Sequence, residues 1–220
     1  MIILGVLNGE SLKPGAMRTI SHRCDRVWAA DGGLKWLIEE NISADGIVGD
    51  LDSIPGSLDS FGGKVVNNPD QNSSDVEKLL AQVVEEGATG VVLTCAHGGR
   101  VDHVLNSMMA ALTTQVEVII LYPQEWCFCV PGAGNWVFGF REGQRISVMP
   151  CGPLRLSLSG VKWPLDHAVL HAPGQTSISN VAISTSVRVE VFAGQGWVFG
   201  GYDEMEVPEW FRSRHLTTAL

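Results

Sequence analysis

The sequence lacks a long apolar run, a basic leader and a pair of cysteines spaced as C-x-x-C. A membrane-spanning helix needs about 20 consecutive apolar residues, so we expect no transmembrane segment and no membrane partner. The opening residues Met1–Glu10 are typical of a first strand rather than a signal peptide. The five cysteines are odd in number, and Cys127 and Cys129 are too close for a zinc or redox motif. This usage favours reduced thiols in a cytoplasmic protein.

A basic excess is also missing. The 220 residues carry 24 acidic and 15 basic side chains, for a formal net charge of −9. Residues 126–220 hold seven of each sign, so the whole acidic excess lies in residues 1–125. Without a basic stripe, a nucleic-acid partner is disfavoured. A small anionic substrate remains compatible with this charge if a metal ion accompanies it.

The first part of the chain alternates short apolar runs with helical patterns. The runs are 2–7, 27–30, 46–48, 64–66, 91–94 and 116–121, and the helical patterns are 34–40, 75–86 and 103–114. This alternation predicts an α/β domain with a mostly parallel sheet covered on both faces. Ligands of such sheets bind beyond the carboxyl ends of the strands.

The helix predicted over 75–86 has the clearest signals at its two ends. Ser74 and Glu77 have the spacing of a capping box, in which each side chain satisfies a free backbone amide of the other residue. Gly87 suits the end of the helix. The apolar residues between these ends recur at helical spacing.

The pattern changes after Tyr122-Pro123. Eight short alternating runs follow, at 126–130, 136–140, 145–149, 154–158, 168–171, 177–183, 187–192 and 197–200, with a helix expected only in about the last dozen residues. Runs of this length, separated by Pro and Gly, predict an antiparallel sandwich or barrel. We therefore expect two domains, α/β over 1–125 and a β-sandwich over 126–220.

The most informative acidic residues are Asp50 and Asp52, which follow the 46–48 run. In an extended segment both side chains project to the same side, where two carboxylates repel unless a cation lies between them. Mg²⁺ is the obvious candidate. The alternative is that both are ordinary turn residues. Asp31 also follows an apolar run, so it is expected at the same edge of the sheet.

Three further polar positions remain open between a functional and a structural interpretation. Asp75, with Lys78 one turn later, begins the 75–86 helix and either binds a metal phosphate or complements the helix dipole. Arg100 follows two glycines and suits a phosphate clamp. Asp102 and His103 begin the next helix, where Asp102 could be only a cap.

Six motifs taken in order resemble those of the thiamine pyrophosphokinase family. They are A-D-G-G (30–33), G-D-L-D-S (49–53), P-D-Q-N-S-S-D-V-E-K (69–78), G-G-R-V-D-H (98–103), G-V-K-W-P-L (160–165) and S-I-S-N (177–180). The resemblance extends to about residue 200. It implies an α/β nucleotide-binding domain followed by a β-sandwich, in a homodimer with active sites between subunits. The implied reaction transfers the pyrophosphoryl group of ATP to the hydroxyl of thiamine, giving thiamine diphosphate and AMP.

The resemblance also implies the roles of individual residues. Mg²⁺ would bind to Asp50, Asp52 and Asp75, and Asp31 would lie near the reacting hydroxyl as a hydrogen-bond acceptor or as a base. The nucleotide would be held by Gln71, Lys78, Arg100, Asp102 and His103. Thiamine would face Ser177, Ser179 and Asn180. Most of the seven tryptophans are expected in the core, and Trp163 could instead line a pocket for a flat heteroaromatic ligand. The acidic domain would suit the cationic thiazolium.

The sequence departs from the family pattern in two motifs. The usual D-Q-D-x-T-D reads D-Q-N-S-S-D, with Asn72 and Ser74, and A-D-G-G-A-N reads A-D-G-G-L-K, with Lys35 near Asp31. These changes spare Asp31, Asp50, Asp52 and Asp75, so activity is expected. The alternatives are a pyrophosphokinase for a pterin-type alcohol, a nucleotide-sugar transferase and a non-catalytic thiamine- or nucleotide-sensing module.

Overall fold

The computed structural model describes residues 1–58, 61–201 and 207–216. The chain divides into two compact units, the first comprising Met1–Pro123 and the second beginning at Gln124. The domain boundary at 125/126 stays a prediction. The predicted tail Asp203–Leu220 falls partly outside the described residues. Among the described helices we find none with the length and apolar character needed to cross a membrane.

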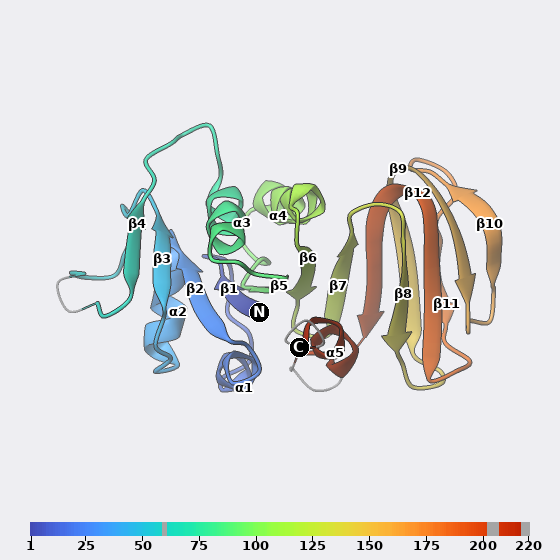
Figure 1. Cartoon of the computed structure of the whole chain (residues 1–220), viewed down its shortest axis with the longest axis horizontal. Coiled ribbons are helices and arrows are strands. Elements are labelled where there is room, and N and C mark those ends of the chain that lie inside the picture. The colour runs from blue at the N-terminus through green and yellow to red at the C-terminus, as the bar shows by residue number, and fades with distance from the viewer. Residues whose placement is uncertain (59–60, 202–206, 217–220) are drawn as a thin grey trace. The chain divides into compact units, whose positions relative to one another are not determined.

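The first unit contains a six-stranded parallel sheet (Figure 1). Its strands are β1 (Ile2–Val6), β2 (Arg26–Ala30), β3 (Gly46–Gly49), β4 (Lys64–Asn67), β5 (Gly90–Thr94) and β6 (Glu117–Leu121), in the order β6-β5-β1-β2-β3-β4. Every neighbouring pair is parallel. All residues of β1, β3 and β5 are buried, as in a sheet covered on both faces.

The helices of the first unit agree with the predicted patterns, with one addition. They are α1 (Ala16–Ser21), the 3₁₀ turn η1 (Asp31–Gly33), α2 (Leu34–Glu39), α3 (Asp75–Glu85) and α4 (Val101–Thr113). The capping box of α3 is confirmed, because the Ser74 amide donates to Glu77 Oε2 at 2.9 Å. Helix α1 was not predicted: it buries only Met17 and Ile20, which is too few apolar positions to show a period.

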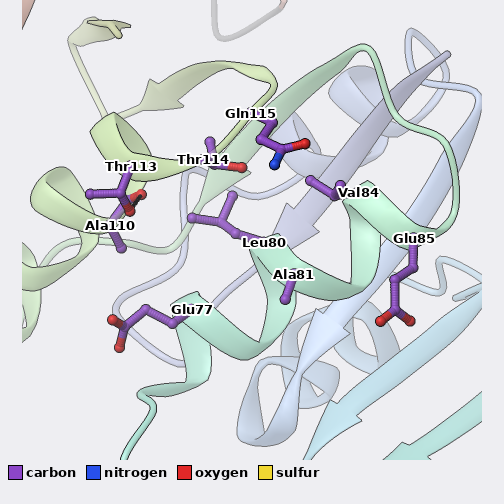
Figure 2. Close-up of a pocket in the computed structure, with 9 residues that line it drawn as sticks. All are labelled: Glu77, Leu80, Ala81, Val84, Glu85, Ala110, Thr113, Thr114 and Gln115. Atoms are coloured by element: carbon purple, nitrogen blue, oxygen red, sulfur yellow. Dashed lines mark hydrogen bonds between the residues drawn. The ribbon is translucent and has the colours of Figure 1, made fainter.

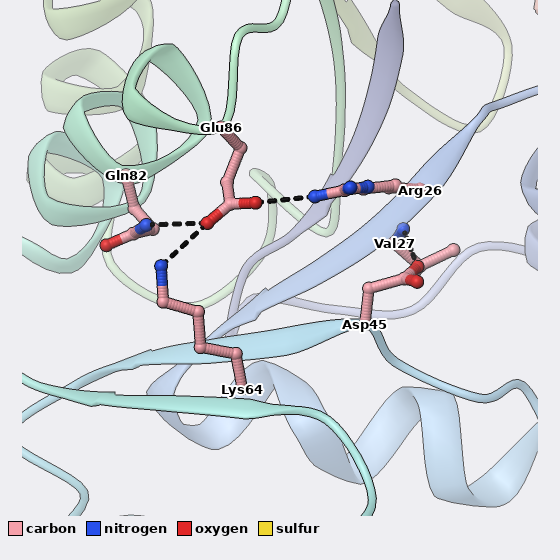
Figure 3. Close-up of polar contacts among 6 residues, drawn as sticks. All are labelled: Arg26, Val27, Asp45, Lys64, Gln82 and Glu86. Carbon is pink, nitrogen blue, oxygen red and sulfur yellow. Dashed lines mark hydrogen bonds and ion pairs between the residues drawn. The ribbon is translucent and has the colours of Figure 1, made fainter.

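An ion-pair network lies at the amino ends of the strands (Figure 3). Glu86, which follows α3, accepts from Arg26 at 2.5 Å, from Lys64 at 2.8 Å and from Gln82 at 3.2 Å. Arg26 begins β2 and Lys64 begins β4. The end of α3 is thus tied to the amino edge of the sheet, while its beginning points to the carboxyl edge.

The second unit is antiparallel, and its described residues form six strands where eight runs were predicted. They are β7 (Glu125–Val130), β8 (Gly134–Gly139), β9 (Arg145–Ser159), β10 (Leu165–Leu170), β11 (Ser177–Val181) and β12 (Ser186–Gly201), followed by the helix α5 (Glu209–Leu216). The separate strands predicted at 145–149 and 154–158 are wrong, as are those at 187–192 and 197–200. Each pair is one long strand, because the pairing of β9 with β12 continues through register shifts between Val191 and Gln195.

The two long strands β9 and β12 each take part in two sets of four paired strands. β8 and β10 pair with the half of β12 and β9 on one side of the shifts, and β7 and β11 pair with the other half. Strand direction therefore confirms the predicted fold class in part: parallel α/β, then antiparallel β. The face-to-face packing of a sandwich stays a prediction.

The core of the second unit is aromatic. Trp126, Phe128, Phe138 and Phe211 are buried, and Trp210 lies 4.7 Å from the Phe138 ring and 5.0 Å from the Trp126 ring between centroids. Helix α5 thus packs on its own unit through Trp210 and Phe211. The prediction that most tryptophans belong to the core is confirmed, whereas Trp163 is 54% exposed.

Candidate active site

A cavity of about 380 Å³ opens at the carboxyl ends of β1 and β5. The sheet order reverses between these two strands, since β2, β3 and β4 follow on one side and β6 on the other. Ligands of open α/β sheets bind at such a switch point. The lining residues come from the loops after β1, β3 and β5, from the loop before α3 and from the first two turns of α3 and α4. Asp50, Gln71, Asp75, Lys78, Arg100 and His103 are among them. Six residues predicted from distant motifs therefore share one cavity.

Three carboxylates form a cluster that shares Asp50 with this cavity. Asp31 follows β2, Asp50 and Asp52 follow β3, and one ligand atom of each lies within 4.8 Å of the others. Asp31 is 3% exposed, and its Oδ1 is buried without a hydrogen-bond partner. Asp75 does not belong to this close set, so the grouping differs from the predicted metal ligands in having Asp31 in place of Asp75.

The Asp50 carboxylate is fixed by Gln71. Gln71 Nε2 donates to Asp50 Oδ2 at 3.2 Å, and this hydrogen bond is the main cause that lowers the pKa of Asp50 below its usual value. Asp50 is therefore ionised at neutral pH. The contact joins the G-D-L-D-S loop to the D-Q-N-S-S-D loop, as expected if both serve one site.

The pKa of Asp75 is shifted in the opposite direction to that of Asp50. Burial raises its pKa, the nearby carboxylates of Asp31 and Asp50 raise it further, and Lys78 opposes the shift. Lys78 itself is only 5% exposed and lines the cavity from the next turn of α3. Three carboxylates and one buried ammonium group thus face a single region, an arrangement typical of a site for metal-bound phosphate.

Arg100 and Asp102 interact with each other at the edge of the cavity. Arg100 Nη2 and Asp102 Oδ2 are 2.5 Å apart, and this hydrogen bond lowers the pKa of Asp102. Both side chains are largely exposed. Arg100 lines the cavity and Asp102 does not, so Asp102 contacts the site through Arg100. His103 lines the cavity from the first turn of α4.

Several lining residues were not predicted, among them Asn8, Gly9, His97 and Asn106. The Gly9 amide donates to Cys95 O at 2.8 Å. A Cβ at position 9 would lie 2.3 Å from that oxygen, so only glycine allows the two loops to approach. The N-G dipeptide after the first strand was the available signal, but nothing local connects it with a loop about ninety residues later.

The predicted thiamine-facing residues lie on β11 of the second unit. Asn180 is 3% exposed, accepts from Trp163 N at 3.2 Å and donates to Trp163 O at 2.7 Å. Ser179 has a left-handed φ of 59°, and its amide donates to Ser147 Oγ at 3.0 Å. Ser177 is half-buried. The Asn180 amide is thus used to hold the backbone of Trp163, whose ring remains exposed beside Lys162.

A larger groove of about 500 Å³ lies between α3 and the end of α4 (Figure 2). It is lined by Glu77, Leu80, Ala81, Val84, Glu85, Ala110, Thr113, Thr114 and Gln115. None of these residues belongs to a predicted site, and the Glu77 carboxylate is engaged with Ser74. The smaller cavity at the switch point is therefore the candidate active site.

Two family models match the chain. The thiamin pyrophosphokinase catalytic domain matches residues 17–121, and the thiamin pyrophosphokinase vitamin B1 binding domain matches residues 138–195. Together they cover most of the chain, in the order of the two units. The catalytic match includes every predicted residue of the cavity.

Relatives and solved structures agree with these matches. Thiamin pyrophosphokinase 1 of Caenorhabditis elegans is 25% identical over 207 residues, 82% of each chain. The fold is similar to thiamine pyrophosphokinase of Bacillus subtilis (TM-score 0.77, 20% identity, 92% of this chain and 100% of that one). It is also similar to thiamin pyrophosphokinase of Candida albicans (TM-score 0.76, 18% identity, 92% and 89%). With the two family models matched in order over most of its length, the chain belongs to the thiamin pyrophosphokinase family.

Proposed function

We propose that the protein transfers the pyrophosphoryl group of Mg-ATP to the hydroxyl of thiamine, giving thiamine diphosphate and AMP. The observation that carries this proposal is the cavity at the switch point, where Asp50, Asp75 and Lys78 converge beside the cluster of Asp31, Asp50 and Asp52. The family membership supplies the reaction, and the cavity supplies a place for the nucleotide.

The residues of the cluster fit Mg²⁺. They offer only carboxylate oxygens, which hard cations prefer, and the buried Asp31 Oδ1 has no partner of its own. Asp31, Asp50 and Asp52 would hold the ion, with Asp75 facing the same region from α3. A carboxylate has two oxygens, so Asp31 can contact both the ion and the thiamine hydroxyl. The ion would neutralise charge on the phosphates during transfer.

The remaining cavity residues bind and orient the nucleotide. Lys78 presents a buried positive charge to the phosphates, and Arg100 and His103 present donors from the start of α4. The thiamine oxygen attacks the β-phosphorus, the bond from the β-phosphorus to the α-phosphate oxygen breaks, and AMP leaves with its electron pair. In this proposal Asp31 accepts the hydroxyl proton. Catalysis is then mostly positioning and charge neutralisation.

We further propose that the second unit binds thiamine, with its two strand sets packed as a β-sandwich. The exposed Trp163 ring offers a flat apolar face, and Ser177 and Ser179 offer hydroxyls on β11. Asn180 supports this surface by holding Trp163. The domains would be 1–125 for ATP and 126–220 for thiamine.

AMP formation tests the proposed function directly. Incubation with thiamine and Mg-ATP is expected to release AMP, and Asp50→Asn and Asp52→Asn are expected to abolish release while leaving the circular dichroism spectrum unchanged. Glu85→Gln, an exposed carboxylate outside the cavity, is the matched control. Thiamine binding without AMP would favour the sensing module, and AMP release only with a pterin-type alcohol would favour the related pyrophosphokinase.

The proposed assembly is a homodimer whose active sites form between subunits. Mixing two inactive variants, Asp50→Asn and Trp163→Ala, tests this. If one chain supplies the nucleotide site and the other the thiamine surface, mixed dimers keep one intact site, and about a quarter of the wild-type activity returns. No recovery on mixing would contradict the shared site. We also propose a reducing, cytoplasmic location, on the odd number and irregular spacing of the five cysteines.

A further inference from the structure

We infer that Asn106 is a positioning residue of the active site: it holds the first turn of α3, and with it Asp75 and Lys78, against the nucleotide cavity. The inference rests on the proposed function for the identity of the nucleotide. It concerns a residue of α4 that belongs to none of the motifs from which the site was predicted.

The contact that carries the inference joins two helices. Asn106 Nδ2 donates to Ser74 Oγ at 2.7 Å, and both residues are half-buried and line the cavity. Ser74 is the N-cap of α3, immediately before Asp75. The Asn106 side chain is thus a direct link from α4 to the residue that begins the catalytic turn of α3.

The directions of the hydrogen bonds at Ser74 show that its hydroxyl accepts from Asn106. Ser74 Oγ donates its one proton to Glu77 Oε2 at 2.5 Å, and Ser74 N donates to the same oxygen at 2.9 Å. The hydroxyl lone pairs remain to accept from Asn106. Because Glu77 and Ser74 complete the capping box by themselves, Asn106 is not needed to cap α3. Its hydrogen bond instead fixes where the capped turn lies relative to α4.

The position of this turn matters for the charges in the cavity. Asp75 is close enough to Asp31 and Asp50 for their carboxylates to interact electrostatically, and Lys78 lies one turn further along α3. In the absence of a cation the carboxylates repel, which pushes the first turn of α3 away from β2 and β3. A tie from α4 opposes that displacement. We therefore expect the loss of Asn106 to weaken binding of the metal nucleotide without unfolding the protein.

Two variants test the inference. Asn106→Ala removes the donor, and Asn106→Asp keeps the size but cannot donate and adds a negative charge beside Glu77. Both are expected to bind Mg²⁺ with α,β-methylene-ATP about tenfold more weakly by calorimetry, and to need a higher Mg²⁺ concentration for half-maximal AMP release. Thr113→Ala is the control, since it removes one side-chain hydrogen bond from the same helix, far along it from the cavity.

A double-mutant cycle with Ser74 separates positioning from general stability. If the two side chains act through one hydrogen bond, Asn106→Ala has little further effect on nucleotide binding in the Ser74→Ala background. Wild-type nucleotide affinity and Mg²⁺ dependence in both Asn106 variants would overturn the inference. A wild-type protein that releases no AMP would instead overturn the proposed function, and the calorimetric comparison would still decide the role of Asn106 in binding.

Discussion

At the scale of single residues, the cluster of Asp31, Asp50 and Asp52 depends on Gly49, which has no side chain. A Cβ at Gly49 would lie 2.8 Å from the Cβ of Asp31. The end of β3 can therefore lie this close to the Asp31 turn only because residue 49 is glycine. We expect Gly49→Ala to displace Asp31, reduce AMP release at least tenfold and cost about 1–3 kcal/mol of the free energy of unfolding. The measurements are turnover and urea unfolding.

The control for this substitution is Gly62→Ala, because a Cβ at Gly62 meets no atom within 4 Å. Gly62→Ala should leave AMP release and the free energy of unfolding near their wild-type values. Full activity in Gly49→Ala would show that the close contact with Asp31 has no part in catalysis.

Asn180, a predicted thiamine contact, is hydrogen-bonded to the backbone of Trp163. Its amide is used by the backbone of Trp163 and by the Val181 amide, which donates to Asn180 Oδ1 at 2.9 Å. We expect Asn180→Ala to lower the free energy of unfolding by about 2 kcal/mol, since buried backbone groups lose their partners. The Michaelis constant for thiamine should rise as the Trp163 loop loosens. If the free energy of unfolding stayed unchanged while the Michaelis constant for thiamine rose, Asn180 would instead contact thiamine directly.

At the scale of elements, α3 connects the two edges of the sheet. Its first turn lines the cavity, and Glu86 after its last turn joins Arg26 and Lys64 at the amino edge. The hydrogen bond from Lys64 is the main cause that lowers the pKa of Glu86 below its model-compound value of 4.5. Because the folded pKa is lower, the stabilisation is present above pH 4.5 and is lost as the pH falls through the folded pKa.

Glu86→Gln tests this element-scale contact. We expect the variant to be less stable than wild type by about 1 kcal/mol at neutral pH, and the difference to shrink toward about pH 3. Urea unfolding at a series of pH values measures it, with Glu85→Gln as the exposed neighbour. A difference that stays constant with pH would mean that the Glu86 carboxylate does not stabilise the fold through its charge.

At the scale of the whole molecule, the described part of the tail from Pro208 onward belongs to the second unit. Phe211 is fully buried against Phe128, with ring centroids 6.3 Å apart. We expect Phe211→Ala to cost about 3–5 kcal/mol and to increase amide exchange in β7 and β8 before β1 and β5. Ile183→Ala, at a position 57% exposed, is the control. Equal loss of protection in all four strands would show that the two units unfold as one.

The elements of the first unit could be predicted because their signals are local. The apolar runs and the Ser74–Glu77 capping box depend on neighbours in the chain, and the strands and main helices formed within a few residues of the expected positions. In the second unit, the break between the predicted runs 145–149 and 154–158 falls at Pro150 and Pro153. They lie within β9, where pairing with β12 continues past them. Whether a strand ends or bends depends on its partner, which local sequence does not specify.

The sequence by itself determined the alternation of elements, the family and the carboxylates Asp31, Asp50, Asp52 and Asp75, because motif order and periodicity are written along the chain. Only the tertiary structure decided which of them meet. Asp31 joined Asp50 and Asp52 because β2 and β3 are neighbours, and the loops after β1 and β5 formed the cavity because the strand order reverses there. The same packing brought Asn106 of α4 to Ser74 of α3. Such contacts depend on distances in space between residues far apart in the chain, and these are set by sheet order and helix packing.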